Sequence, residues 1–230
     1  MSGLKLGTVT IGQAPRTDVQ PMLDMHLPAG VERVDVGVLD RLSDADIASR
    51  FAPRPREQKM LTRLLDGRPV EVDARAAEAG VQRKLLELED AGCTVIVVLC
   101  TGVFRALRTR RAWLIAPDRI LPSLVGGLVG ARKVGIVTPI DMPLDAARRK
   151  WAALQLPPGV AVASPYAPGD EAVEAAVREL QRAGAEALLL DSIGFTGRHR
   201  AAAARATGLT VLLSSELVAR VTGACLYEAP

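Results

Sequence analysis

The stretch Ala91–Gly102 constrains the fold of this chain most strongly. Its five central residues, Val95–Leu99, are apolar and mostly β-branched without a polar break, which is typical of a parallel strand covered on both faces. Cys100, Thr101 and Gly102 follow directly. Ligands of open α/β sheets bind just outside the carboxyl ends of strands, so Cys100 is a candidate catalytic residue. The alternative is a small buried apolar residue, because free cysteine is among the most buried residue types.

The composition argues against a nucleic-acid partner. Apolar residues make up 49% of the 230 residues and aromatic residues only 3%, so we expect an aliphatic core with few rings on which bases can stack. The 29 basic and 26 acidic residues nearly balance at a net charge of +3, and the basic residues are scattered rather than gathered into a stripe. We interpret the arginine-rich segments 105–111 and 198–200 as solvated helix faces or as contacts for an anionic small molecule.

The cysteine content and the apolar runs predict a soluble, cytoplasmic protein without a membrane partner. The three cysteines are an odd number and lack the spacing of a disulfide framework, which fits a reducing compartment. The first residues read directly into a strand rather than into a secretory signal. No apolar run approaches the roughly 18–20 residues that a membrane span needs.

Strand and helix signals alternate along the whole chain and predict an α/β protein with parallel sheets. Asp66-Gly67 lies between two alternating runs, a pattern that predicts a β-hairpin, and Ser43 is the expected N-cap of a short helix. The expected strands are 4–11, 31–39, 95–99, 112–116, 133–138, 160–164, 186–190 and 209–213; the expected helices are 19–25, 42–51, 74–90, one turn at 103–109, 117–130, 143–154, 170–183, 196–206 and a final one up to 225.

The two halves of the chain match each other by motif. Residues 5–11 match 133–139 with an offset of 128 (133 − 5), whereas residues 91–102 match 183–194 without a gap at an offset of 92 (183 − 91). The first half therefore carries an insertion of about the length of the hairpin segment. The match predicts two pseudo-symmetric flavodoxin-like lobes whose parallel sheets face a central cleft, with Cys100 and Ser192 at equivalent strand ends.

The same match sets the expected domain boundaries. Residues 1–116 together with 214–230 are predicted to form the first lobe, with the hairpin insertion at about 41–75. Residues 117–213 are predicted to form the second lobe. Residues 113–116 match 211–214, and in each half an aliphatic helix is expected to follow.

Five motifs stand out along the chain: Thr10–Arg16, the Asp66-Gly67 hairpin, Asp118–Pro122, Gly194-Phe195 and His199-Arg200. They resemble motifs of the AroM family, within the aspartate/glutamate racemase-like superfamily. The resemblance covers essentially the whole chain and implies a two-lobed racemase-like fold, a homodimer and no cofactor. It also implies the superfamily's shared chemistry, which is proton transfer or isomerisation next to a carboxylate by thiols on two opposing strands.

Carried over residue by residue, one thiol position of the superfamily falls on Cys100 and the other on Ser192. A serine hydroxyl is a far weaker acid and base than a thiol near neutral pH unless a partner activates it. The resemblance therefore favours one-thiol relatives, such as arylmalonate decarboxylase-like and maleate isomerase-like enzymes. We predict a racemase/isomerase/lyase-like enzyme that acts on a small carboxylate through one thiol. The alternative is a non-catalytic racemase-fold protein that binds a small metabolite or a regulatory partner.

The remaining candidate residues are predicted to bind the substrate, and each has a structural alternative such as a helix cap. Backbone N–H groups at Thr101 and Gly102 can stabilise a thiolate, and Arg16 can grip a carboxylate with two hydrogen bonds or remain a surface arginine. No set of histidine, cysteine and carboxylate residues has metal-ligand spacing. The candidate substrate-binding residues are Gln13, Arg16, Thr101, Gly102, Thr138, Asp191, Ser214 and His199.

Overall fold

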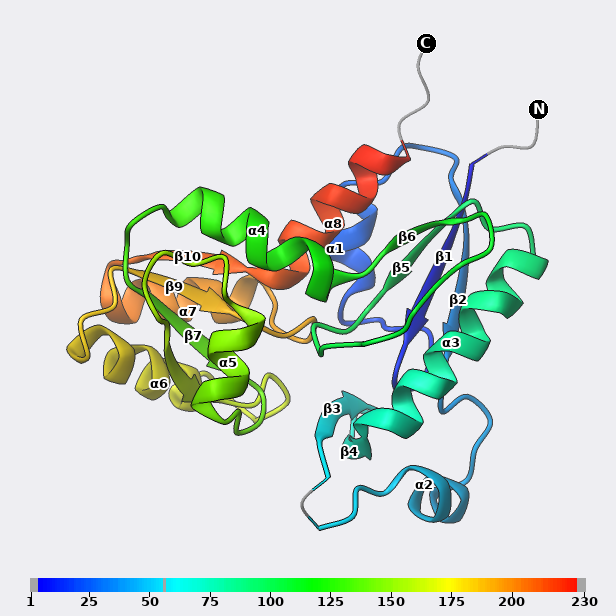
Figure 1. Cartoon of the computed structure of the whole chain (residues 1–230), viewed down its shortest axis with the longest axis horizontal. Coiled ribbons are helices and arrows are strands. Elements are labelled where there is room, and N and C mark those ends of the chain that lie inside the picture. Colours follow the sequence, from blue (N-terminus) through cyan, green and yellow to red (C-terminus); the bar gives the residue numbers. More distant parts are fainter. Residues whose placement is uncertain (1–3, 56, 227–230) are drawn as a thin grey trace. The chain divides into compact units, whose positions relative to one another are not determined.

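The computed structural model describes residues 4–55 and 57–226 and has an α/β fold with two four-stranded parallel sheets (Figure 1). The chain divides into two compact units, the first made of Met1–Pro117 and Ala219–Pro230 and the second of Asp118–Val218. The predicted fold class, with a parallel sheet in each half and a hairpin in the first, is confirmed. Among the helices in this part of the chain, none combines the length and apolar character needed to cross a bilayer.

The first unit is built on a sheet with the strand order β2-β1-β5-β6. Its strands are covered by α3, whose inner stripe of Ala77, Val81 and Leu85 is fully buried. Asp73 caps this helix, because its side chain accepts the N–H of Ala76, as is usual for an N-cap aspartate. The elements are β1 (Lys5–Thr10), α1 (Gln20–Asp24), β2 (Glu32–Gly37), α2 (Asp44–Phe51), α3 (Ala74–Asp90), β5 (Val95–Val98) and β6 (Trp113–Ile115).

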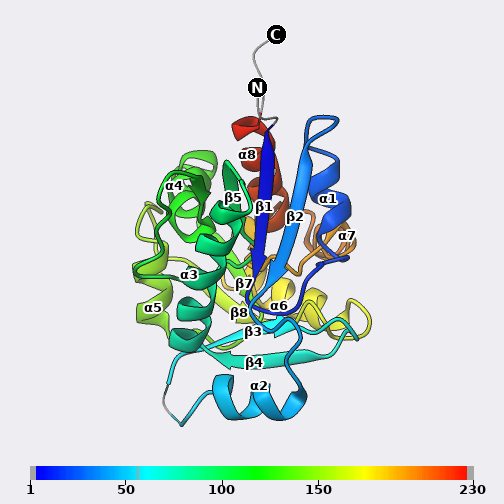
Figure 2. The same cartoon turned by 90° about the vertical axis from the view of Figure 1, so that its right-hand side faces the viewer.

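The predicted hairpin is confirmed as the antiparallel pair β3 (Lys59–Arg63) and β4 (Pro69–Asp73). Gly67 in its turn has a φ of +92°, a backbone conformation that favours glycine. The hairpin and α2 lie beyond the carboxyl ends of β1 and β2 (Figure 2). The Ser43 cap of α2 is also confirmed, as a capping box with Asp46.

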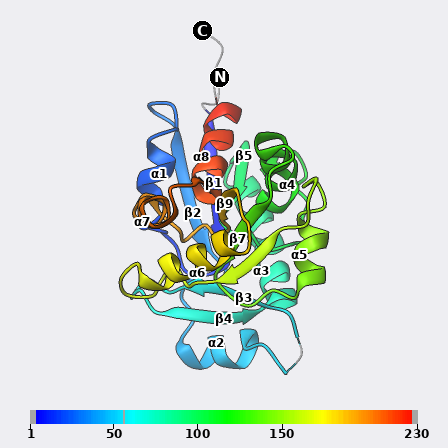
Figure 3. The same cartoon turned by 90° about the vertical axis from the view of Figure 1, so that its left-hand side faces the viewer.

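The second unit repeats this plan with the strand order β10-β9-β7-β8. Figure 3 shows this unit, with β7, β9, α5, α6 and α7 labelled. The predicted apolar stripe of α6, which includes Val173, Val177 and Leu180, is buried. The final helix α8 begins in the second unit and ends in the first. The elements are α4 (Pro117–Val129), β7 (Val134–Thr138), α5 (Leu144–Lys150), β8 (Gly159–Val162), α6 (Glu171–Arg182), β9 (Ala187–Leu190), α7 (Gly197–Thr207), β10 (Thr210–Leu213) and α8 (Ser214–Cys225).

The internal repeat is visible in the backbone hydrogen bonds of the two sheets. Strands β2, β1, β5 and β6 correspond in order to β8, β7, β9 and β10. At the end of β5 the Leu99 N–H donates to the Val9 carbonyl at 2.7 Å, and at the end of β9 the Asp191 N–H donates to the Val137 carbonyl at 2.8 Å. Leu99 and Asp191 are therefore equivalent positions, and so are Cys100 and Ser192, which follow them.

The helical turn predicted at residues 103–109 is wrong. The segment is an irregular loop, whose N–H groups are bound by side chains of α3 rather than by its own carbonyls. Glu78 accepts the N–H groups of residues 105 and 106 at 2.6 and 2.7 Å, and Gln82 accepts that of residue 108 at 2.9 Å. Contacts from another helix thus replace the local bonds that the sequence pattern suggested.

Candidate functional site

The first candidate feature is the turn Cys100–Gly102 at the carboxyl end of β5. The Gly102 N–H donates to the Cys100 sulfur at 3.3 Å, so one of the predicted backbone donors lies at the thiol. Cys100 and Thr101 are 9% and 7% exposed. A hydrogen bond to the charged form of a group favours that form, so this turn is suited to stabilising a thiolate.

The hairpin packs directly on this turn. A Cβ placed on Gly102 would lie 2.8 Å from Cε of Met60, a residue of β3, and 3.3 Å from the Cys100 sulfur. Met60, Phe104 and Leu107 belong to the same buried cluster as Cys100. The thiol therefore lies in largely apolar surroundings, against a turn in which a glycine allows the thioether to approach closely.

Gln13 ties the loop after β1 to two neighbouring segments. Its amide nitrogen donates to the Leu39 carbonyl at 3.3 Å, and its amide oxygen accepts the Leu65 N–H at 2.9 Å. The backbone N–H of Gln13 also donates to the Arg63 carbonyl at 3.3 Å. The Gln13 side chain thus connects the loop after β1 to the loop after β2 and to the hairpin turn.

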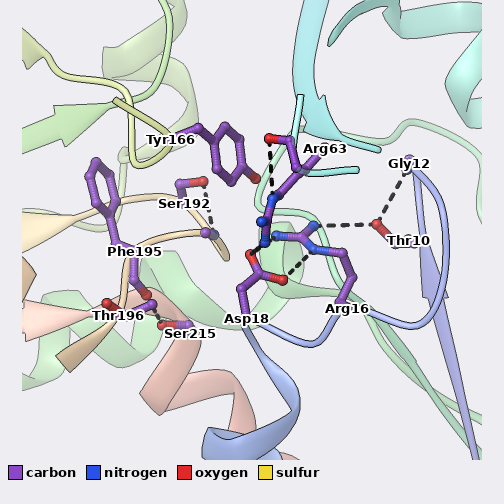
Figure 4. A network of polar contacts seen from close by, with 12 residues as sticks. Thr10, Gly12, Arg16, Asp18, Arg63, Tyr166, Ser192, Phe195, Thr196 and Ser215 are labelled. Carbon is purple, nitrogen blue, oxygen red and sulfur yellow. Dashed lines mark hydrogen bonds and ion pairs between the residues drawn. The ribbon is translucent and has the colours of Figure 1, made fainter. Parts of the chain in front are cut away.

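Arg16 is buried, at 6% exposure, and its guanidinium is engaged by a carboxylate of the protein itself (Figure 4). Nε and Nη2 donate to the two oxygens of Asp18 at 2.8 and 2.7 Å, and Nη1 donates to the Thr10 hydroxyl at 3.4 Å. Burial alone would raise the pKa of Asp18, but the hydrogen bonds and charge of Arg16 hold that pKa below its usual value. Arg16 therefore makes with Asp18 the two hydrogen bonds that were predicted for a substrate carboxylate.

The second candidate feature is the turn Ser192–Gly194 at the carboxyl end of β9. The Gly194 N–H donates to the Ser192 hydroxyl oxygen at 3.2 Å (Figure 4). A Cβ placed on Gly194 would lie 2.7 Å from the Tyr166 hydroxyl oxygen. The turn has the same side chain to glycine hydrogen bond as the Cys100 turn, with a hydroxyl in place of the thiol.

A buried ion pair stands immediately before Ser192, and sequence reasoning missed one of its members. Lys150, at the end of α5, places its ammonium nitrogen 2.5 Å from Oδ2 of Asp191, and the two side chains are 3% and 0% exposed. The Ser214 hydroxyl donates to Oδ1 of Asp191 at 3.3 Å. Lys150 is the last residue of a basic run that begins at Arg148. Such a run at a helix end is typical of a solvated terminus. The sequence pattern therefore does not indicate that the Lys150 side chain is buried.

Thr138 and His199 bind parts of their own unit. The Thr138 hydroxyl donates to the Ile140 carbonyl at 2.8 Å. Nδ1 of His199 accepts the Thr196 N–H at 3.0 Å, which caps α7. Burial, together with the charge of Arg198, lowers the pKa of His199. This favours the neutral ring, whose Nδ1 accepts the hydrogen bond at the helix terminus.

The two remaining thiols, Cys93 and Cys225, are poorly suited to act as nucleophiles. Burial raises the pKa of Cys93 and of Cys225, which favours the unreactive thiol form. Within residues 4–55 and 57–226, no group of three or more histidine, cysteine, aspartate or glutamate side chains is arranged to hold a metal ion.

Comparison with known proteins identifies the family and the fold. The sequence model described as AroM protein matches residues 6–226. Comparison with curated protein sequences gave no match. Similar solved structures include an allantoin racemase from Pseudomonas fluorescens (TM-score 0.60, 13% identity, covering 97% of this chain and 91% of that one). They also include a maleate isomerase from Pseudomonas putida S16 (TM-score 0.60, 13% identity, covering 98% of this chain and 93% of that one). A third is an arylmalonate decarboxylase (TM-score 0.56, 17% identity, covering 98% of this chain and 93% of that one).

Proposed function

The chain belongs to the AroM family, and from this premise we propose that it is a cofactor-independent enzyme that acts on a small carboxylate through the Cys100 thiol. The observation that carries the proposal is the hydrogen bond from the Gly102 N–H to the Cys100 sulfur at the end of a parallel strand. The proposed reaction class is racemase-, isomerase- or lyase-like. The names of the structurally similar proteins support this class, because they include racemases, an isomerase and a decarboxylase.

In the proposed reaction Cys100 acts as the proton donor or the nucleophile. Ser192 takes the equivalent position in the second unit, and its hydroxyl is too weakly acidic and basic to act as a second thiol. We therefore assign the hydroxyls of Ser192 and Thr101 to binding substrate oxygens, while the Gly102 N–H stabilises the Cys100 thiolate. The contacts of Gln13, Arg16, Thr138 and His199 favour supporting roles for these four residues.

We propose further that the protein is a cytoplasmic homodimer whose partner outside the dimer is a small anionic metabolite rather than a nucleic acid. The resemblance to the AroM family supports the dimer, and the near balance of charge supports the small-molecule partner. Light scattering on purified protein at several concentrations tests the dimer. A mass equal to one chain at all of them would contradict it.

The test of the proposed function uses four probes in D₂O followed by proton NMR: maleate, aspartate, glutamate and phenylmalonate. Isomerisation, loss of the Cα proton signal or decarboxylation of at least one probe is expected. In Cys100→Ala the rate should fall by about 10²-fold or more, because a positioned acid or base typically contributes that much. Cys93→Ala, which removes a thiol outside the candidate site, is the matched control and should keep the rate.

One observation favours the alternative of a binding protein without turnover: the second thiol position holds Ser192. In that case a probe raises the melting temperature of the native protein, as a bound ligand does, and raises it equally in Cys100→Ala. Turnover that survives unchanged in Cys100→Ala would contradict the proposed role of the thiol itself.

A further inference from the structure

The second unit contains a buried polar network, and the first unit has apolar residues at two of the three equivalent positions. The network consists of Lys150, Asp191 and Ser214, joined by the contacts at 2.5 and 3.3 Å described above. The repeat places Leu99 at the position of Asp191 and Ala116 at the position of Ser214. Both equivalents are apolar and buried, at 4% and 1% exposure.

This difference shows that the fold of a lobe does not require the network. Withdrawing two charges from water costs free energy, and replacing a buried ion pair by apolar residues of similar volume is often neutral or stabilising. The first unit holds apolar residues at two of the three positions and forms the same strand order. Stability therefore gives no sufficient reason for the pair in the second unit.

The network acts on the residue directly before Ser192. The Asp191 N–H is bound to β7 through the Val137 carbonyl, while its carboxylate is held by α5 through Lys150 and by the start of α8 through Ser214. Three elements thus fix the backbone from which the Ser192–Gly194 turn departs. The turn in the first unit leaves its sheet from an apolar residue, Leu99.

The hydrogen bonding of Ser192 leaves its proton available. The hydroxyl oxygen accepts the Gly194 N–H at 3.2 Å, and no group within residues 4–55 and 57–226 accepts a hydrogen bond from this hydroxyl. A hydroxyl that accepts from its own turn keeps one donor. That donor is suited to an oxygen atom of a carboxylate.

We propose that Lys150, Asp191 and Ser214 are positioning residues that hold the Ser192 turn so that its hydroxyl donates to a substrate oxygen. This inference rests on the proposed function and extends it to the second unit. The end of β9, which has Ser192 in place of a thiol, binds the substrate instead of being an inactive copy of the Cys100 turn.

The test installs a reporter thiol with Ser192→Cys and measures its alkylation by iodoacetamide from pH 6 to 10, resolved by peptide mass spectrometry. The measurement is repeated after Lys150→Met, Asp191→Leu and Ser214→Ala are added, which gives the second unit apolar residues at all three network positions. We expect the rate at position 192 near pH 7 to fall by about tenfold, equivalent to about one pKa unit, because the turn no longer holds the Gly194 N–H against the sulfur. The melting temperature and the Cys100 rate should be unchanged.

Two further variants secure the test. Lys150→Met with Asp191→Asn keeps an acceptor for Ser214 and serves if the triple substitution does not fold. Arg178→Met with Glu174→Gln removes an exposed ion pair of α6 and is the matched control, which should leave the rate at position 192 unchanged.

Either of two results overturns the inference: an unchanged rate at position 192 in a folded network variant, or the unfolding of both network variants. The second would show that the network is structural. An inert Cys100 in the same samples, with position 192 still responding, would instead count against the proposed function.

Discussion

The carboxyl ends of β5 and β9 share a backbone and differ in chemistry. In each, a glycine N–H donates to the side chain two residues earlier, at 3.3 Å to sulfur in the first unit and at 3.2 Å to oxygen in the second. The preceding residue is Leu99 in one and the ion-paired Asp191 in the other. The comparison teaches that the repeat conserves the turn, while single side chains decide which chemistry each turn offers.

The two turns are also covered by different groups. Met60 of the hairpin packs on Gly102, whereas Tyr166 packs on Gly194. The hairpin insertion of the first unit therefore adds an apolar, flexible side chain beside the thiol. In the second unit a rigid phenol ring takes the corresponding place beside the hydroxyl.

The largest expected effect is the loss of unfolding free energy when the Lys150–Asp191 ion pair is broken. Lys150→Met alone leaves the Asp191 carboxylate buried without its cation, and removing one partner of a buried pair typically costs about 3–5 kcal/mol. Urea unfolding should show this loss, and the added change Asp191→Leu should restore most of it. A cost below about 1 kcal/mol for the single variant would mean that the pair is far better solvated than its burial indicates.

The next effect concerns Glu89 of α3 and its repeat equivalent, Gln181 of α6. Burial opposes the charge of Glu89, but hydrogen bonds from the N–H groups of Ala112, Arg110 and Arg111 lower its pKa to about 2. Gln181 is neutral and donates to the Thr207 carbonyl at 2.7 Å.

A folded-state pKa below the unfolded one means that this stabilisation is complete above the ordinary value of 4.5 and is lost as the pH falls toward 2. Glu89→Gln should therefore cost about 1.5–3 kcal/mol at pH 7, the usual worth of hydrogen bonds to a charged group. It should also flatten the pH dependence of the melting temperature between pH 5 and 2. An equally steep loss of stability in the variant would assign the acid sensitivity to other carboxylates.

The smallest expected effect on stability compares Met60 and Tyr166, the side chains that pack on Gly102 and Gly194. Gly194→Ala places a methyl group 2.7 Å from the Tyr166 hydroxyl oxygen, and Gly102→Ala places one 2.8 Å from Cε of Met60. Overpacking typically costs about 1–3 kcal/mol, and we expect this range at Gly194 but less than about 1 kcal/mol at Gly102, since a thioether end can rotate away. Gly127→Ala, with nothing within 4 Å of the new atom, is the matched control in thermal unfolding. A greater loss of stability at Gly102 than at Gly194 would show that Met60, and not Tyr166, is the more rigid of the two side chains.

Much of the fold could be predicted because its signals are local. Apolar runs marked the strands, Asp66-Gly67 marked the hairpin turn, and Ser43 marked a helix start. The gap-free match of 91–102 with 183–194 is enough to place Cys100 and Ser192 at equivalent strand ends. These features depend on neighbours in sequence or on the repeat itself.

The rest depends on contacts between distant segments, which the sequence does not display. Side chains of α3 bind the N–H groups of the 103–112 loop, so the helical turn expected there does not form. Lys150 follows Arg148 and Arg149 in a run that reads as a solvated helix end, yet it is directed into the unit toward Asp191. Arg16 and Asp18 are two residues apart, a spacing that does not reveal their mutual engagement.

The central claim, that the β5 turn prepares Cys100 for chemistry, is tested most directly by site-resolved alkylation of the native protein with iodoacetamide near pH 7. Cys93 and Cys225, whose pKa values are raised by burial, are internal references in the same sample. We predict that Cys100 reacts at least about tenfold faster than either of them, because a thiolate is the reactive form. Reaction of Cys100 as slowly as Cys93, with modification only when the protein unfolds, would contradict it.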